Sequence, residues 1–278
     1  MIKSLTAVLI AFTVALAAAA AVIAAGLYDV SATSGHTQPV YSLLEITMRR
    51  SIQNRARAIV VPSLSSAQTP ARGAACYRDH CEQCHGGPGV APKSIGKSMQ
   101  PLPGFLMDAS TKWQPREIYL IVRDGIKMSG MPAWGWHLGE NDLWSTVAFV
   151  ERLPELSPPA YMAALEDARA LQCVGTEIDA GKASGLDSTQ QARVALRQYA
   201  CPACHLIPGI AGPAFRLGPP LDEFAKRAMI AGRLANTPEN LVLWIKAPRS
   251  VNPNTAMPDM GVTDAHARLM AAYLLSLR

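Results

Sequence analysis

The chain has 278 residues, of which 49% are hydrophobic, and a formal net charge of +5 at pH 7. Its Lys and Arg residues are spread along the sequence and form no dense stripe with interleaved aromatic residues, which argues against a nucleic-acid-binding protein. The length allows two small domains.

Residues 1–27 are predicted to form a transmembrane anchor. No charged residue occurs from Leu5 to Leu27, and about 20 apolar helical residues cross a bilayer. A cleaved signal peptide is the alternative, since Ala24-Ala25-Gly26 could be cleaved, but the apolar region of a signal peptide usually has only about 7–15 residues. Lys3 precedes the segment and residues 28–47 contain no Lys or Arg, so the positive-inside rule places the N-terminus in the cytoplasm and the rest across the membrane.

Residues 28–70 are predicted to contain a juxtamembrane amphipathic helix and a connector. Apolar residues recur every four positions from Val40 to Ala56, a pattern typical of such a helix. The same segment contains Arg49, Arg50, Arg55 and Arg57. The helix either lies on anionic headgroups or docks a membrane partner, or it packs its apolar stripe on the next domain. The sequence favours neither interpretation of the helix. Residues 60–73 are rich in Ser and Pro and are expected to form the connector.

Two Cys-x-x-Cys-His motifs follow, at Cys81–His85 and Cys201–His205, each with a downstream Met-Pro pair, Met131-Pro132 and Met257-Pro258. Residues three apart on a helix share a face, so both sulfurs of a motif can reach the two vinyl groups of one porphyrin, and the adjacent histidine can meet the iron. A methionine at the other axial position raises the reduction potential. A zinc half-site or a redox dithiol is the alternative, but no further Cys or His pairs at zinc spacing remain. We therefore expect two covalently bound haem c groups.

Both segments resemble class I c-type cytochrome domains, in which an N-terminal helix carries the motif, a loop carries the methionine and a C-terminal helix crosses the first. The resemblance covers residues 71–155 and 190–278 and leaves 156–189 as a linker with some structure. It is carried by Tyr77–Gly87, Gly125–Trp134, Tyr199–Gly209 and Ala256–Pro258. It implies an all-α fold with two tandem cytochrome c domains behind the N-terminal transmembrane helix.

The expected helices follow from Pro, Gly and capping signals. In the first domain they cover residues 71–84, 115–125 and 140–153. In the second they cover residues 189–204 and 221–231, a helix begun by Thr237 and Pro238, and residues 264–277.

The resemblance also implies the site residues. The haems would be bound through Cys81, Cys84, Cys201 and Cys204, and the irons ligated by His85, Met131, His205 and Met257. Met128 and Met260 compete as ligands, but in the family the methionine directly before proline is the usual one. The other four histidines are expected to be surface or capping residues: His36, His80, His137 and His266.

Cys76 and Cys173 lie outside both motifs. In an oxidising compartment they would form a disulfide, whereas Cys76 could also be buried as a small hydrophobic residue. The sequence leaves both alternatives open.

These features predict a dihaem cytochrome anchored in a bacterial inner membrane, with its haem domains in the periplasm. It would pass single electrons from a quinol-oxidising cytochrome bc-type complex or a periplasmic dehydrogenase to a terminal oxidase or reductase, as a shuttle or as a fixed subunit, and it needs no catalytic group. The alternative is a dihaem enzyme, a peroxidase or a thiosulfate-type dehydrogenase, with one open iron. A Met-Pro pair behind each motif argues against that alternative.

Overall fold

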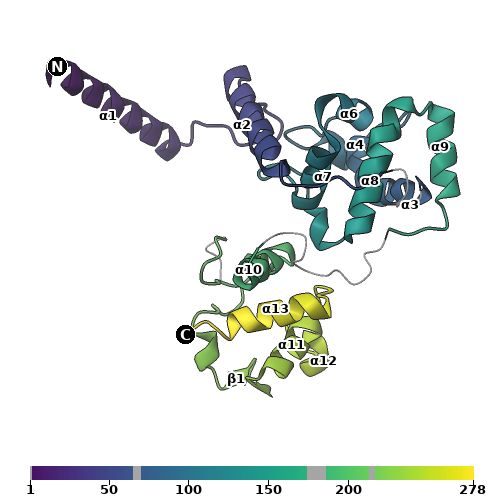
Figure 1. Ribbon diagram of the computed structural model, residues 1–278. Helices are drawn as coiled ribbons and strands as arrows, with labels where there is room; N and C mark the ends of the chain where they lie inside the picture. Colours follow the sequence, from purple (N-terminus) through teal and green to yellow (C-terminus); the bar gives the residue numbers. More distant parts are fainter. Residues whose placement is uncertain (1, 65–69, 174–185, 213–216) are drawn as a thin grey trace.

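The computed structural model describes residues 2–64, 70–173, 186–212 and 217–278 (Figure 1). These residues form a projecting N-terminal helix and two mostly helical lobes, which we call the first lobe (38–173) and the second lobe (186–278). Each lobe has its own cluster of buried apolar residues. The described residues are mostly helical, as expected, and they also include one short hairpin.

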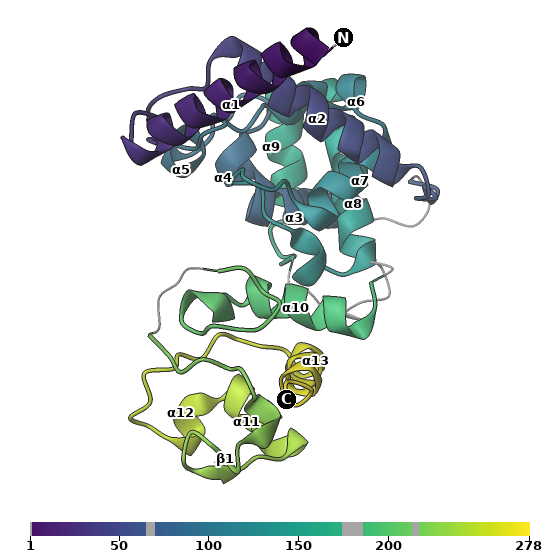
Figure 2. The ribbon, with the colours of Figure 1, turned by 90° about the vertical axis from the view of Figure 1, so that its left-hand side faces the viewer.

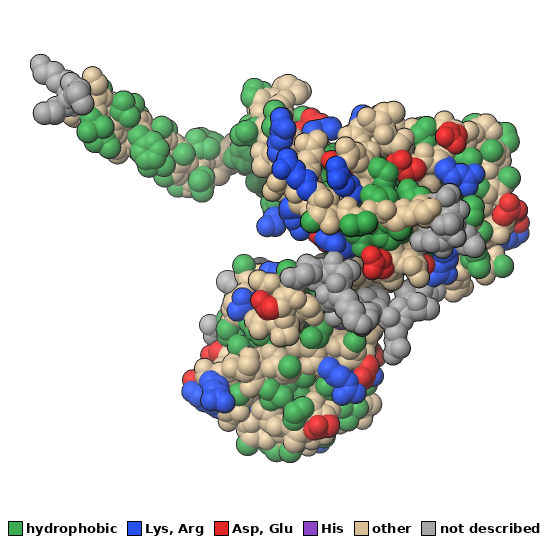
Figure 3. All heavy atoms as spheres, in the orientation of Figure 1, with side chains coloured by type: hydrophobic (Ala, Val, Ile, Leu, Met, Phe, Trp, Pro, Cys, Tyr) green, Lys and Arg blue, Asp and Glu red, His purple; other side chains and the backbone are tan. Residues whose placement is uncertain are grey.

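Helix α1 (Ile2–Ala24) extends away from both lobes, and its described side chains are exposed (Figures 1 and 3). Its segment Ser4–Ala24 has a mean hydropathy of 2.6, and within the described part of the chain it alone is long and apolar enough to cross a membrane. A membrane anchor and a signal sequence both have this character.

The C-terminal half of helix α2 (Gln38–Ala56) packs on the rest of the first lobe. Ile52 and Ala56 are buried there against Leu120. Arg49 adds a cation–π contact, with its guanidinium carbon 4.6 Å from the centre of the Trp113 ring. The packing interpretation therefore holds for this half of the helix.

The N-terminal half of α2 is different because its large apolar side chains are exposed to solvent. They are Val40, Tyr41, Leu43, Leu44 and Ile46. Lys and Arg side chains gather over α2 in the space-filling view (Figure 3). Exposed apolar side chains followed along the helix by basic residues are typical of a segment that lies on a membrane surface, so this interpretation applies to the N-terminal half.

The first lobe is built on the crossing of α3 (Pro70–Cys76) and α8 (Glu140–Arg152). A Cβ on Gly73 would lie 2.3 Å from the carbonyl oxygen of Ser145, so only glycine allows this close approach. After α3 the chain continues through a π-helical turn, Tyr77–Cys81, into α4 (Glu82–His85). The remaining helices before α8 are α5 (Ser94–Lys97), α6 (Ala109–Lys112) and α7 (Pro115–Asp124), with 3₁₀ turns at Leu106–Asp108 and Trp134–Trp136.

Helix α9 (Pro158–Asp167) packs on the first lobe, although its residues were expected in the linker. It follows a 3₁₀ turn at Leu153–Glu155. Tyr161 is fully buried, and its hydroxyl donates to Glu82 Oε1 at 2.8 Å. Leu165 is also in the buried cluster. The first core thus extends well past residue 155, because α9 covers the helix that carries the first motif.

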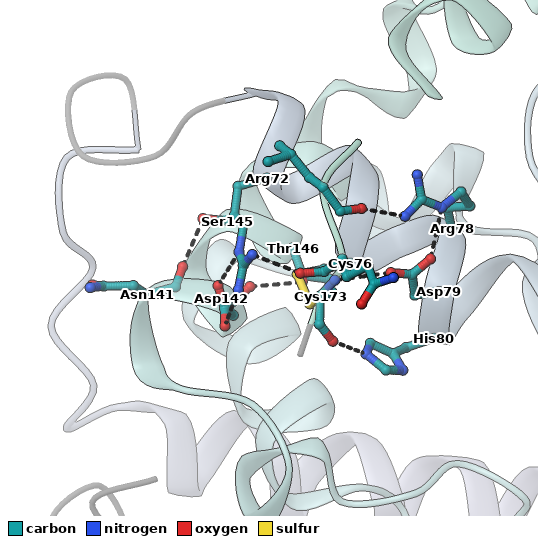
Figure 4. Close-up of a disulfide and its surroundings, with 12 residues drawn as sticks. Arg72, Cys76, Arg78, Asp79, His80, Asn141, Asp142, Ser145, Thr146 and Cys173 are labelled. Carbon is teal, nitrogen blue, oxygen red and sulfur yellow. Dashed lines mark hydrogen bonds and ion pairs between the residues drawn. A yellow bond between two sulfur atoms is a disulfide. The ribbon is translucent and has the colours of Figure 1, made fainter. Parts of the chain in front are cut away.

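Cys76 and Cys173 form a disulfide, which joins α3 to the segment after α9 (Figure 4). Side chains around it hold the same segment. Arg78 donates to the carbonyl oxygens of Ala168 and Leu171, at 3.0 and 2.7 Å, and Asp79 accepts the backbone N–H of Cys173 at 3.0 Å. The disulfide alternative is therefore the one found.

The second lobe is built on the crossing of α10 (Ser188–Gln198) and α13 (Asp264–Leu274). Small buried residues let the two helices approach: Ala192, Ala195, Ala267 and Ala271. Helices α11 (Pro238–Lys246) and α12 (Pro248–Val251) complete the lobe. In both views α10 lies on the side of the lobe that faces the first lobe (Figures 1 and 2).

Two expectations for the second lobe were wrong. The helix expected over 189–204 ends at Gln198, because Ala200 has a left-handed backbone (φ 53°) that an α-helix cannot contain. The helix expected over 221–231 is replaced by a 3₁₀ turn, Phe224–Lys226, and an antiparallel pair of short strands, β1 (Met229–Ile230) and β2 (Leu234–Ala235).

Candidate haem-binding sites

The first motif lies at the end of the helix that begins with α3. Cys81 is buried at the last position of the π turn, and Cys84 is half-buried in α4. Gly86 ends the helix with a positive φ (66°), which favours glycine because it has no Cβ. The hydroxyl of buried Tyr77 donates to the Gly86 carbonyl oxygen at 2.7 Å and so fixes this end.

His85 is oriented by one hydrogen bond, 2.7 Å long, between Nδ1 and the carbonyl oxygen of Gly104. A carbonyl only accepts, so Nδ1 carries the proton and Nε2 keeps a free lone pair. Burial lowers the pKa of His85, and the Gly104 hydrogen bond opposes this shift. A neutral imidazole that donates Nδ1–H to a carbonyl oxygen can bind a metal through Nε2, and metal-binding histidines usually have such a partner.

The second motif begins directly after Ala200 and lies in a 3₁₀ turn, Cys201–Ala203, rather than in an α-helix. His205 is nevertheless held as His85 is, with Nδ1 2.7 Å from the carbonyl oxygen of Pro219. Gly218 lies against the imidazole, since a Cβ there would be 2.5 Å from the His205 ring. The loop behind this histidine therefore both orients it and leaves room for it.

The four motif cysteines are free thiols, whereas the two cysteines outside the motifs are paired with each other. Burial raises the pKa of Cys81 to about 12 and that of Cys201 to about 11. Each motif keeps its two sulfurs available for one porphyrin.

The backbones of the two candidate axial methionines are held by hydrogen bonds of the same kind. The N–H of Met131 donates to Ser129 Oγ at 3.1 Å, and the N–H of Met257 donates to Thr255 Oγ1 at the same distance. Met131 is half-buried and packs against the first core, and Met257 is half-buried as well. The competing Met128 is 91% exposed. This contrast favours Met131 over Met128.

Sequence reasoning missed the groups that hold the ligands. The pattern hydroxyl-x-Met-Pro, which recurs at Ser129 and Thr255, was a signal that could have been found. The carbonyls of Gly104 and Pro219 had no such signal, because any residue has a backbone carbonyl.

His266 was expected at the surface or as a capping residue. Its backbone N–H does donate to the N-cap residue Thr263, but its side chain is fully buried. Nδ1 lies 3.0 Å from the hydroxyl of Tyr199. His80 is half-buried, with Nε2 2.9 Å from the carbonyl oxygen of Cys173. Neither side chain is a free surface group.

The residues present fit covalently bound haem in both lobes. Each site offers two free thiols, a histidine whose Nδ1 is occupied by a carbonyl, and a downstream methionine with a tethered backbone. Histidine and methionine are the axial pair of c-type cytochromes.

Comparison with known proteins supports the interpretation of the first lobe as a domain that binds haem covalently. Residues 68–150 match the family model of cytochrome c oxidase, cbb3-type, subunit III. A segment of 91 residues, 32% of the chain, is 37% identical to cytochrome c oxidase subunit 2 of Alkalihalophilus pseudofirmus, and it spans 25% of that protein's length. A chain of the reducing HAO-like protein complex of Kuenenia stuttgartiensis aligns over 79% of this chain and 99% of its own length, with 21% identity and a TM-score of 0.28. The family match and the oxidase relative support a c-type cytochrome that binds haem c covalently and transfers electrons.

Proposed function

We propose that the protein is a membrane-anchored dihaem c-type cytochrome that carries single electrons. Residues 71–155, extended by α9, would form the first haem domain, and residues 190–278 the second. The donor would be a cytochrome bc-type complex or a periplasmic dehydrogenase, and the acceptor a terminal oxidase or reductase. The protein would act as a shuttle or as a fixed subunit of one of these complexes.

The observation that carries the proposal is the matched orientation of the two motif histidines. His85 and His205 follow different backbone conformations, yet each places Nδ1 2.7 Å from a loop carbonyl oxygen. Each therefore keeps Nε2 available as an iron ligand. Haem bound at these sites supplies one-electron chemistry at iron, which no side chain of the protein provides by itself.

The protein's own residues would do three things at each site. The cysteine pair, Cys81 with Cys84 or Cys201 with Cys204, would hold the porphyrin through thioethers. The histidine would ligate one side of the iron, and Met131 or Met257 the other. With both axial positions filled, substrate cannot reach the iron, which favours electron transfer over an enzymatic role.

The membrane anchor is proposed from α1 and from the exposed apolar end of α2. Residues 1–27 would remain in the mature protein, with residues 28–70 at the membrane surface and both haem domains in the periplasm. The segment shared with an oxidase subunit is consistent with a partner in a terminal oxidase complex.

Substitution of the methionines tests the function. Met131→Ala should lower the midpoint potential of the first haem only and let it bind carbon monoxide when reduced, because loss of the thioether opens the sixth position. Met257→Ala should do the same to the second haem only. Redox titration and carbon monoxide difference spectra of the detergent-solubilised protein measure both effects.

Met128→Ala and Met260→Ala are the matched controls and should leave both irons six-coordinate. Ready carbon monoxide binding by the parent protein, or rapid turnover of peroxide or thiosulfate, would contradict the electron carrier and favour a dihaem enzyme.

A further inference from the structure

One loop of the first lobe reaches the second lobe. It is the 3₁₀ turn Trp134–Trp136, which is separated from Met131-Pro132 by one residue, Ala133. Trp136 packs against the buried cluster of the second lobe, and its ring centre lies 5.2 Å from that of His266. The side chain of His137 interacts with that of Gln198 in α10. The loop that follows the candidate methionine of the first site therefore contacts both helices that cross in the second lobe.

On the first-lobe side, this loop also contacts the first motif. The Trp134 ring centre lies 4.5 Å from that of His80, which directly precedes Cys81. His80 is held in place because its Nε2 is 2.9 Å from the carbonyl oxygen of Cys173, the disulfide-bonded residue (Figure 4). Trp134 is in turn edge-on to His137, with 6.3 Å between ring centres. The first motif is thus joined to His137 by ring contacts, and His137 is joined to Trp136 by the peptide bond between them.

On the second-lobe side, His266 connects the contact to the second motif. Its ring centre lies 5.6 Å from that of Tyr199, which stands two residues before Cys201. Its Nδ1 is 3.0 Å from the Tyr199 hydroxyl. Its Nε2 is buried and has no hydrogen-bond partner among the described residues. An unpartnered buried polar atom costs about 1–3 kcal/mol, so Nε2 of His266 does not stabilise this contact.

We propose that this row of rings is the route by which an electron crosses between the two haem domains, and that Trp136 against His266 is the crossing point. The row consists of His80, Trp134 and His137, then Trp136, which is bonded to His137 along the backbone, and then His266 and Tyr199. The proposal rests on the proposed function, since it requires a haem at each motif. Electron tunnelling weakens with distance and is faster through packed atoms than across a solvent gap, and this row replaces such a gap between the lobes with ring contacts.

The step moves one electron from the reduced domain to the oxidised one, so one iron loses what the other gains. No bond forms or breaks, and no other oxidant or reductant is required. The rings are not themselves oxidised. Trp136 and His266 are positioning residues, because they set the spacing and the packing between the two sites.

The test uses the full-length, haem-loaded protein in detergent. One electron is injected by pulse radiolysis, and the absorbance of the two haems follows its redistribution between them. Trp136→Leu should slow this internal equilibration by about tenfold or more, which corresponds to about 1.4 kcal/mol in the barrier. Trp136→Phe should restore most of the rate because it restores a ring. The midpoint potentials and spectra of both haems should not change.

Trp113→Leu is the matched control, since Trp113 is a half-buried tryptophan of the first lobe that contacts Arg49, not the second lobe. It should leave the rate unchanged. Pulsed electron paramagnetic resonance between the two ferric irons gives a second measurement. Slow equilibration with an unchanged distance supports a role in the route, and slow equilibration with a broadened distance supports a role in spacing.

An unchanged equilibration rate in Trp136→Leu would overturn this inference while leaving the dihaem cytochrome intact. A parent protein with a single haem would instead overturn the proposed function, so the two failures are distinguishable.

Discussion

The two lobes present the same five-residue motif in different structural settings. In the first lobe the motif continues a helix through a π turn, and α9, a disulfide and several charged side chains hold that helix from the other side. In the second lobe the helix ends at Gln198, a left-handed residue follows, and the motif begins in a 3₁₀ turn. Among the described residues of the second lobe there is no disulfide.

What the lobes share is the carbonyl behind the histidine. Gly104 and Pro219 lie in loops downstream of their motifs, and each accepts a 2.7 Å hydrogen bond from Nδ1. The orientation of the histidine therefore depends on the wrapping loop and not on the helix type beneath the motif. The first lobe also contains a disulfide and an ion pair with a nearly buried carboxylate, Arg72–Asp142, whereas the ion pair Arg268–Asp264 of the second lobe lies at the surface.

The largest expected effect comes from removing the disulfide. Cys76→Ala with Cys173→Ala should destabilise the first lobe by about 4 kcal/mol, because the bridge spans 97 residues and restricts the unfolded chain. Hydrogen exchange measured by mass spectrometry should accelerate in α3 and α8 but not in α10 and α13. A reductant should act in the same way on the parent and have no further effect on the double variant. Equal acceleration in both lobes would mean that the disulfide does not distinguish them.

Acid should affect the second lobe through His266. Burial, with a smaller contribution from the charge of His137, lowers the pKa of His266 from 6.5 to about 4. The unfolded chain therefore binds a proton that the folded chain does not between these two values, so stability falls as the pH drops through this window. The loss should reach about 3 kcal/mol, at about 1.4 kcal/mol per pH unit.

Unfolding by guanidinium at about pH 7 and at about pH 4.5, monitored by hydrogen exchange in peptides from α13, measures this loss of stability. Tyr199, whose hydroxyl contacts His266, and His137 are the other titratable groups to account for. His266→Phe should flatten the pH dependence, whereas His36→Gln, at an exposed position, should leave it intact. An unchanged acid response in His266→Phe would show that another group is responsible.

A smaller effect is expected from ion pairs of the two lobes. Arg72 pairs with Asp142 through two hydrogen bonds, of 2.6 and 3.0 Å, and the Asp142 side chain is only 9% exposed (Figure 4). Arg72→Met leaves this carboxylate without its cation and should cost about 2 kcal/mol. In the second lobe Arg268 pairs with Asp264 on the surface, where both side chains are about half exposed or more. Arg268→Met should change stability by less than about 0.5 kcal/mol. Equal losses in the two variants would contradict the contrast between the lobes.

The helices with strong end signals could be predicted from the sequence. Pro115 opens α7, Thr263 caps α13, and the apolar residues Leu143, Val147 and Val150 expected on one side of α8 are buried. The end of α10 could not be predicted, because Ala200 is a good helix former by itself and only the tertiary structure gives it a left-handed backbone. The hairpin was missed for a related reason. Ala231 and Gly232 turn with positive φ inside a segment whose composition favours a helix.

The candidate sites were predictable in their side chains but not in their surroundings. The two motifs and the Met-Pro pairs are visible in the sequence. The position of α9 over the first motif was not, since its packing depends on Tyr161 and on a disulfide partner 97 residues from Cys76. The contact between Trp136 and His266 joins residues of different lobes and has no local signal.

The central claim is that both lobes carry a haem, and the number of haems per chain tests it most directly. The purified full-length protein should retain two haems per chain after acid–acetone extraction, measured by the pyridine haemochrome absorbance against protein mass. Cys201→Ala with Cys204→Ala should retain one, as should Cys81→Ala with Cys84→Ala. A single covalently bound haem in the parent protein would contradict the account.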